Sequence, residues 1–323
     1  MIERSWADLK ADALEAYQFR LASDPRLTWH IETDKIEPSD FVGIVQYYNF
    51  ASEKLKCSIC DRAVHNAGAV IQVSDHTFRL VGCCCGKKHF SSDWTKQTSA
   101  FHKAERHALR RKRAKLILLR WDDIHNYLSS LRRPFQILED ARRSIKGALG
   151  NDFGLLCKDL SEHHGVLTYT RRLGSKLLNQ GGRSSMTSVR EEIGLVDGWT
   201  IYSHFDFRKR LENSISDMHT SLNHLRTAID KNIDPSKGLR LFYETKEMLE
   251  TLQREISFAS RYGDISNFHH INEWLGHNGS SKKLVVHDGT IMVKQPGWPD
   301  RSIEIFSFSA PSYNEALFDI DAH

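Results

Sequence analysis

The sequence lacks the apolar segments that take a chain into or across a membrane. Its longest aliphatic run is Leu116–Leu119, whereas a membrane-spanning helix needs roughly 20 apolar residues. Residues 1–10 include acidic side chains and a tryptophan, and they contain no apolar stretch of the kind found in a secretion signal. We therefore expect a soluble, cytoplasmic protein that has no membrane partner.

Familiar catalytic motifs are also missing. The sequence contains no phosphate-binding Gly-x4-Gly-Lys-Ser/Thr loop, no Gly-x-Gly-x-x-Gly, no His-Glu-x-x-His and no Gly-x-Ser-x-Gly. The strongest remaining catalytic candidate is a stripe of His269, Glu273 and His277, which would share one helix face and could hold a metal. Capping and surface pairing explain the same residues, and Glu162–His164 is a weaker candidate. The sequence therefore favours a protein that is not an enzyme.

What is present indicates a folded chain of more than one domain. The 323 residues include 45 Lys or Arg and 41 Asp or Glu, so the formal net charge is +4. Hydrophobic residues make up 40% of the chain and charged residues 27%, which is a globular rather than a disordered composition. The length suits two or three domains.

Proline is scarce, and its scarcity leaves room for long helices. Between Pro38 and Pro235 the only proline is Pro134, where we expect a kink or a break. Apolar residues step by three and four along three segments, a spacing typical of helices that pack side by side as in a coiled coil. The three segments are Ile117, Trp121, Ile124, Leu128, Leu131, Phe135, Leu138, Ile145, Leu149; Leu211, Ile215, Met218, Leu222, Leu225, Ile229; and Phe242, Thr245, Leu249, Leu252, Ile256, Ala259.

The remaining segments are shorter. An amphipathic helix is predicted from Trp6 to Leu21, with Ser5 and Asp8 spaced as a capping pair, and a second short helix over about 40–55. Glycines punctuate residues 150–204, which we interpret as an insertion. Near the end, residues 283–287 and 290–293 flank Asp288-Gly289 as in a β-hairpin, and residues 301–308 could add a third strand.

The predicted fold class is therefore mostly α with small β units: a zinc finger joined to a long antiparallel, coiled-coil-like helical hairpin and a small C-terminal β-hairpin unit. A turn at residues 234–238 makes the second and third segments antiparallel neighbours. We divide the chain into an N-terminal helical segment (1–56), a zinc finger (57–99), a first long helical arm (100–149), a Gly-rich basic insertion (150–204), the helical hairpin (205–262) and a C-terminal β-unit with an acidic tail (263–323).

Five of the six cysteines lie within one short stretch: Cys57, Cys60, Cys83, Cys84 and Cys85. A disulfide framework would spread its cysteines through a small secreted chain, so metal binding is the better interpretation. A Cys-x2-Cys knuckle is followed by two short apolar strands, 69–73 and 78–81, and then by the cysteine triplet. This order resembles a treble-clef zinc finger, and the Val-Gly-x-x-Cys-x3-His-Phe pattern is similar to zinc modules of many uncharacterised bacterial and phage proteins. The resemblance covers only about residues 57–90.

Zinc prefers four nitrogen or sulfur donors in a tetrahedron, commonly delivered as two close pairs. Cys85 and His89 are four residues apart and would share a helix face, so the predicted Zn²⁺ ligands are Cys57, Cys60, Cys85 and His89. The sequence leaves alternatives: Cys83 could replace Cys85, and His65 or His76 could replace His89. Ordinary buried thiols are the competing interpretation, and a structural role for the metal is favoured over a catalytic one.

Two basic stretches follow the cysteines. Residues 102–115 include a single acid, Glu105, and residues 163–190 include none. Such arrangements favour phosphate contacts, although a solvated helix face would look the same. The predicted nucleic-acid-binding residues are Lys103, Arg106, Arg110, Arg111, Lys112, Arg113 and Lys115 in the first stretch and Arg171, Arg172, Lys176 and Arg183 in the second.

These observations predict a non-catalytic, zinc-stabilised component of a larger nucleoprotein assembly. The partners would be DNA or RNA together with other protein subunits, and the resemblance of the zinc segment suggests a mobile element or a bacterial defence system. A protein–protein adaptor or inhibitor acting through the helical hairpin is an alternative from another class. A metal-dependent enzyme using the His269, Glu273 and His277 stripe is a third.

Overall fold

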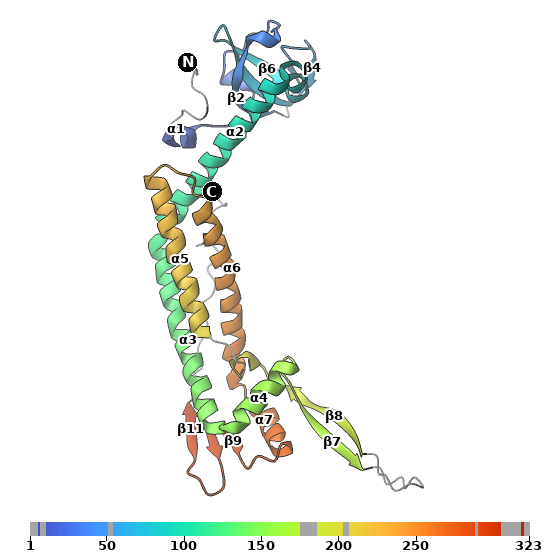
Figure 1. Cartoon of the computed structure of the whole chain (residues 1–323), viewed down its shortest axis with the longest axis vertical. Helices are drawn as coiled ribbons and strands as arrows, with labels where there is room; N and C mark the ends of the chain where they lie inside the picture. Colours follow the sequence, from blue (N-terminus) through green and yellow to red (C-terminus); the bar gives the residue numbers. More distant parts are fainter. Residues whose placement is uncertain are drawn as a thin grey trace, which may run out of the picture. The chain divides into compact units, whose positions relative to one another are not determined.

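The computed structural model describes residue 6 and residues 11–50, 54–174, 186–202, 207–287, 290–304 and 318–319. The chain divides into two compact units (Figure 1). The first unit comprises residues 1–118 and 224–239, and the second comprises residues 119–223 and 240–323. Helix predominates, as the sequence predicts. None of the described helices is both long and apolar enough to cross a bilayer.

The first unit is built on a four-stranded sheet of order β1-β2-β5-β6. The strands are β1 (Arg20–Leu21), β2 (Phe41–Asn49), β5 (Ala67–Val73) and β6 (Phe78–Gly82); β1 runs parallel to β2, and the other pairs are antiparallel. Strands β3 (Leu55–Lys56) and β4 (Ala63–His65) form a separate hairpin. The helices are α1 (Ala11–Ala16), the short η1 (Pro25–Leu27) and η2 (Pro38–Asp40), and α2 (Cys83–Leu119), which begins directly after β6.

The prediction of a short helix over 40–55 is wrong, because residues 41–49 form strand β2. This segment is rich in aromatic and β-branched residues, which favour strands. Both faces of the sheet are covered: Ile44 and Ile71 enter one apolar core, and Val45 and Val70 enter another. A strand buried on both faces loses the alternation that identifies strands in a sequence.

The predicted N-terminal helix is shorter than expected. Among the described residues of this segment, Ala11–Ala16 is helical as α1 and Leu21 lies in strand β1, while Ser5 and Asp8 fall outside the described residues. Trp6 is buried against Phe101 of α2 with 5.0 Å between ring centroids, and its indole N–H donates to the Ile44 carbonyl at 3.1 Å. These contacts join the N-terminal segment to the sheet and to α2.

The first long helical arm predicted at residues 100–149 consists of two helices, and they separate at Arg120 rather than at Pro134. Helix α2 ends at Leu119, Arg120 has non-helical backbone angles (φ −96°, ψ 12°), and α3 (Trp121–Leu149) begins after it. In contrast, α3 continues through Pro134 without interruption, so the break predicted there is absent. A second local distortion lies at Ser91 inside α2, with φ 45° and ψ −112°.

In the second unit, α3 packs with α5 (Phe207–Asp230) and α6 (Ser236–Ala259), and the three helices lie side by side in Figure 1. The ring contacts Trp121–His219 and Phe135–Phe207 show that α3 and α5 run antiparallel. An ion pair of 2.7 Å joins Arg210 of α5 to Glu255 of α6. The last turns of α5 and the first residues of α6 belong to the first unit.

The three- and four-residue apolar spacing correctly predicted which helix faces are buried. The fully buried side chains include Ile124, Leu128, Leu131, Phe135 and Leu138 on α3, Leu211, Met218 and Leu222 on α5, and Phe242, Leu249, Leu252 and Ile256 on α6. Burying such stripes provides most of the stability of helices this long, because isolated helices are marginal in water.

Residues 150–204 contain ordered structure that the sequence analysis did not predict. Helix α4 (Asn151–Glu162) is followed by a long antiparallel hairpin of β7 (Val166–Gly174) and β8 (Met186–Leu195) and by the short helix η3 (Trp199–Tyr202). Residues 175–185, which connect the strands, are not described.

The C-terminal part agrees with the prediction of a small β-unit. After α6, the 3₁₀ turn η4 (Ser260–Gly263) leads into α7 (Ile265–His277). Strands β9 (Lys283–His287), β10 (Thr290–Lys294) and β11 (Arg301–Glu304) then form an antiparallel sheet of order β11-β10-β9. The predicted Asp288-Gly289 turn and the end of the third strand at 305–308 lie outside the described residues.

Candidate metal centre and basic surfaces

Three cysteines converge at the end of the sheet in the first unit. Cys57 follows β3, Cys60 lies in the turn before β4, and Cys85 lies in the first turn of α2. Their sulfur atoms are all within 4.8 Å of one another. Sulfur atoms this close, from one turn and from the start of a helix, could hold a metal ion.

A tight turn places Cys57 and Cys60 side by side. The amide of Asp61 donates to the Cys57 carbonyl at 2.9 Å, and the Cys57 amide donates to the Arg62 carbonyl at 3.0 Å. Asp61 has φ 60°, a left-handed conformation that Asp tolerates better than most residues. The amide of Ser58 donates to the Leu80 carbonyl, which fixes the turn against β6.

The pKa values of the Cys57 and Cys85 thiols are shifted in opposite directions. Burial alone would raise the pKa of Cys57, but the backbone N–H groups of Cys60, Gly82 and Ile59 point at its sulfur and lower the pKa below the ordinary value. Burial and the neighbouring Cys60 and Cys57 sulfurs raise the pKa of Cys85 to about 12. A bound cation would reverse that increase, because metals bind thiolates.

The other predicted ligands do not join this group. His89, Cys83, Cys84 and His76 are all exposed, and His65 is half-buried in β4. Within the described part of the chain, Cys57, Cys60 and Cys85 are the one group of three or more His, Cys, Asp or Glu residues with converging ligand atoms. The structure thus supports three of the four predicted ligand positions and leaves the fourth position open.

Helix α2 contains the whole of the first basic stretch, residues 102–115. It contains ten Lys or Arg residues and only two acids, Asp93 and Glu105. Lys103, Arg106, Arg110 and Arg113 follow one another at steps of three, four and three, so they share one helix face. Glu105 pairs with Arg20 and lies 3.2 Å from the His102 imidazole.

Three of the predicted phosphate-binding cations form ion pairs within the first unit. Arg111 is 4% exposed and its Nε donates to Glu15 at 2.7 Å; Lys115 lies 2.6 Å from the same carboxylate. Arg110 pairs with Asp234 at 2.9 Å. Because the Arg111 guanidinium is buried, the structure removes it from the predicted surface. Lys103, Arg106 and Lys112 are exposed, and Arg113 is half-buried.

The second basic stretch lies on the β7–β8 hairpin. The side chains of Arg171 and Arg190 are exposed, Arg171 lies 3.6 Å from Glu191, and Arg190 lies 3.9 Å from Asp159. Arg172 is in β7, but its side chain is not described, and Lys176 and Arg183 lie outside the described residues.

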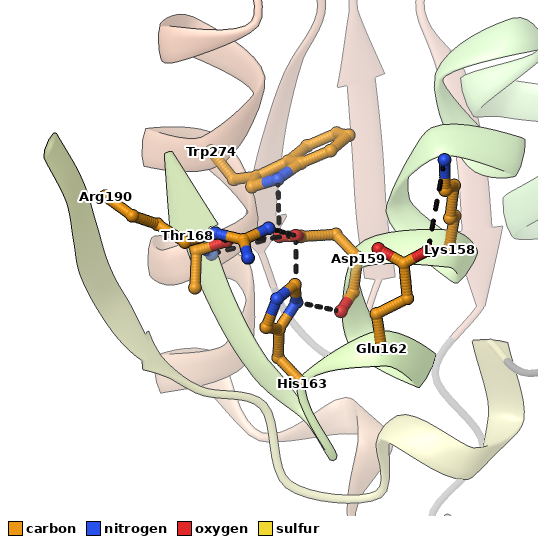
Figure 2. A network of polar contacts seen from close by, with 7 residues as sticks. All are labelled: Lys158, Asp159, Glu162, His163, Thr168, Arg190 and Trp274. Atoms are coloured by element: carbon orange, nitrogen blue, oxygen red, sulfur yellow. Dashed lines mark hydrogen bonds and ion pairs between the residues drawn. The ribbon is translucent and has the colours of Figure 1, made fainter. Parts of the chain in front are cut away.

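A polar network joins this hairpin to α4 and α7 (Figure 2). The Asp159 carboxylate, 14% exposed, accepts hydrogen bonds from the Thr168 amide at 2.9 Å, the Thr168 hydroxyl at 3.0 Å and the Trp274 indole N–H at 3.0 Å. Nδ1 of His163 lies 3.1 Å from the same carboxylate. The sequence pointed to His163 but not to Asp159, because one of the donors to its carboxylate, the Trp274 indole, lies 115 positions away in the chain.

We expect the Asp159→Ala variant to destabilise the second unit by about 3 kcal/mol. The substitution leaves the Trp274 indole N–H and the Thr168 amide and hydroxyl without their acceptor, and each unsatisfied buried group costs roughly 1–3 kcal/mol. Urea unfolding of the full chain measures the effect. Glu162→Ala, in the same helix but at an exposed ion pair with Lys158, is the matched control and should cost less than about 0.5 kcal/mol. Equal effects of the two variants would contradict the role given to Asp159.

The His269, Glu273 and His277 stripe lies on α7, and all three side chains are exposed. His277 lies 3.9 Å from Glu273 and stacks on Tyr169 with 3.7 Å between ring centroids. The stripe does not form a converging ligand group in the described structure. The stacking of His277 on Tyr169 shows instead that this part of α7 packs against the β7–β8 hairpin.

Comparison with known proteins gives no relative for this chain. No family model, no curated protein and no solved structure matches it.

Proposed function

We propose that this protein is a non-catalytic, zinc-stabilised nucleic-acid-binding component of a larger nucleoprotein assembly. The observation that carries the proposal is the pair of exposed cations Lys103 and Arg106, which share one face of the helix whose first turn contains Cys85. A zinc ion at the three cysteines would fix the start of this helix to the sheet. The exposed cations farther along it would then contact successive phosphates, each contact releasing condensed counterions.

Zinc suits the three sulfur donors better than a hard cation such as Mg²⁺ or Ca²⁺, which prefers oxygen ligands. A structural role suits the site, because Cys57 is buried and none of the carboxylates that the structure describes joins the group. Arg171 and Arg190 would add a second, separate set of phosphate contacts on the β7–β8 hairpin.

Exposed apolar side chains such as Leu109 and Leu119 lie singly on α2, as is common on protein surfaces. Charge rather than exposed apolar area therefore supports the proposal.

We expect the double variant Lys103→Gln/Arg106→Gln to bind nucleic acid about tenfold more weakly than the wild type at 150 mM NaCl. Losing two phosphate contacts should also reduce the slope of log affinity against log salt by about 1.8 for the duplex DNA and by about 1.4 for the single-stranded RNA. Fluorescence anisotropy with a labelled 30-nucleotide RNA and a labelled 30-base-pair DNA, across a salt series, measures both quantities and distinguishes the two partners.

The matched control is Arg240→Gln/Arg254→Gln, which also removes two exposed cations but from α6, where each pairs with a glutamate. It should leave the affinity and the salt slope nearly unchanged. Unaltered binding by the α2 double variant would show that this face does not contact phosphates. Salt-insensitive capture of a single protein with no affinity for either probe would support the adaptor alternative instead.

A further inference from the structure

The metal centre lacks a fourth ligand, and a buried imidazole nitrogen beside it has no partner. Nε2 of His65 is buried without a hydrogen bond among the described residues. Nδ1 of the same ring is 3.0 Å from the Tyr48 hydroxyl. A buried nitrogen without a partner carries a cost of roughly 1–3 kcal/mol that a metal bond would remove.

His65 is adjacent to the cysteine group through Gly82. The Gly82 amide N–H donates to the Cys57 sulfur, and the His65 ring lies against the Cα of the same glycine. A Cβ at Gly82 would lie only 2.9 Å from Cδ2 of His65, so the absence of a side chain there is what admits the ring. The imidazole and the Cys57 sulfur thus contact the same residue.

We propose that Nε2 of His65 is the fourth ligand of the metal held by Cys57, Cys60 and Cys85, an inference that rests on the proposed metal centre. With the ion on Nε2, the ring proton is on Nδ1 and is donated to the Tyr48 oxygen. Such outer hydrogen bonds commonly orient histidine ligands. Since Nε2 is not within 4.8 Å of all three sulfurs, the ring moves toward them when the ion binds.

The competing ligands fit less well. Cys83 and Cys84 are exposed and lie two positions and one position before Cys85, and residues with these separations do not face one another on a helix. His89 shares the face of Cys85 but is exposed, and none of the described residues hydrogen-bonds to its ring. His65 alone among the histidines near the group combines burial of Nε2 with an anchored Nδ1.

The test compares full-length wild-type protein with His65→Ala, His65→Cys and His89→Ala. Zinc affinity is measured by competition with a chromophoric chelator, and the ligand set is read from the absorption spectrum of the Co²⁺-substituted proteins. We expect His65→Ala to lose at least about 100-fold in zinc affinity, more than the roughly 10–100-fold typical of losing an outer-shell partner. Its Co²⁺ spectrum should lose the pattern of a tetrahedral three-sulfur, one-nitrogen site.

The other two variants distinguish a metal ligand at His65 from a histidine that only supports the local structure. His65→Cys should restore tight binding with a four-sulfur Co²⁺ spectrum, which a merely structural histidine would not produce. His89→Ala should match the wild type in affinity and in spectrum. Wild-type binding of one metal with an unchanged His65→Ala spectrum would overturn this inference and leave the metal centre intact. Failure of the wild type to bind either metal would overturn the proposed metal centre and this inference together.

Discussion

Serine in place of Cys57 is expected to abolish stoichiometric zinc binding and to destabilise the first unit by about 5 kcal/mol or more. Structural zinc supplies apparent free energies of about 10–16 kcal/mol in small zinc-finger peptides. We expect less here, because the sheet already has apolar cores on both faces. Without the metal, the start of α2 would be held to the Cys57–Cys60 turn by the contacts of β6 and by the apolar core against which Ile59 and Cys85 pack.

The measurement is zinc content per chain after gel filtration, combined with urea unfolding with and without a strong chelator. Cys84→Ser is the matched control, because Cys84 lies in the same cysteine triplet and is exposed outside the group of three. It should retain one zinc per chain and wild-type stability. If Cys57→Ser also retained its zinc and its stability, the three cysteines would be ordinary thiols in a small sheet.

The second large effect concerns the buried ion pair between Glu15 of α1 and Arg111 of α2. The two side chains are 12% and 4% exposed. Removing one partner of a buried pair leaves an uncompensated charge and costs about 3–5 kcal/mol. We expect Glu15→Ala to destabilise the first unit by about 3 kcal/mol, measured by urea unfolding of the zinc-loaded chain, because Glu15 retains some solvent contact.

Two further variants distinguish the effect of the buried Glu15–Arg111 pair from that of other charges nearby. Asp12→Ala removes an exposed acid from the same helix, 3.5 Å from Lys115, and should cost less than about 0.5 kcal/mol. The double variant Glu15→Leu/Arg111→Met replaces both charges with apolar groups and should recover most of the lost stability. A double variant as unstable as Glu15→Ala would show that the charge of Arg111 is not the cause.

The Glu15–Arg111 ion pair should also make the stability of the first unit depend on pH. Burial would raise the pKa of Glu15, but hydrogen bonds and charges from Lys115 and Arg111 outweigh it and hold the pKa below its ordinary value of 4.5. A carboxylate with a lowered folded-state pKa stabilises the protein above its unfolded pKa, and the contribution disappears as the pH falls through the folded pKa. The wild type should therefore lose more stability than Glu15→Ala below about pH 4.5.

The sequence by itself determined the features that depend on local spacing. Apolar steps of three and four identified the buried faces of α3, α5 and α6, because one stripe per helix must be removed from water. The Cys-x2-Cys spacing located the turn that brings Cys57 and Cys60 together. Alternating residues on both sides of a two-residue turn identified strands β9 and β10 of the C-terminal sheet.

Only the tertiary structure decided the features that depend on distant partners. Strand β2 was mistaken for a helix because apolar cores cover both of its faces and remove the alternating pattern. Arg111 was assigned to a phosphate-binding surface because nothing near it in the sequence reveals Glu15, which lies 96 positions away. The acceptor role of Asp159 and the unpartnered nitrogen of His65 depend in the same way on segments that meet only when the chain has folded.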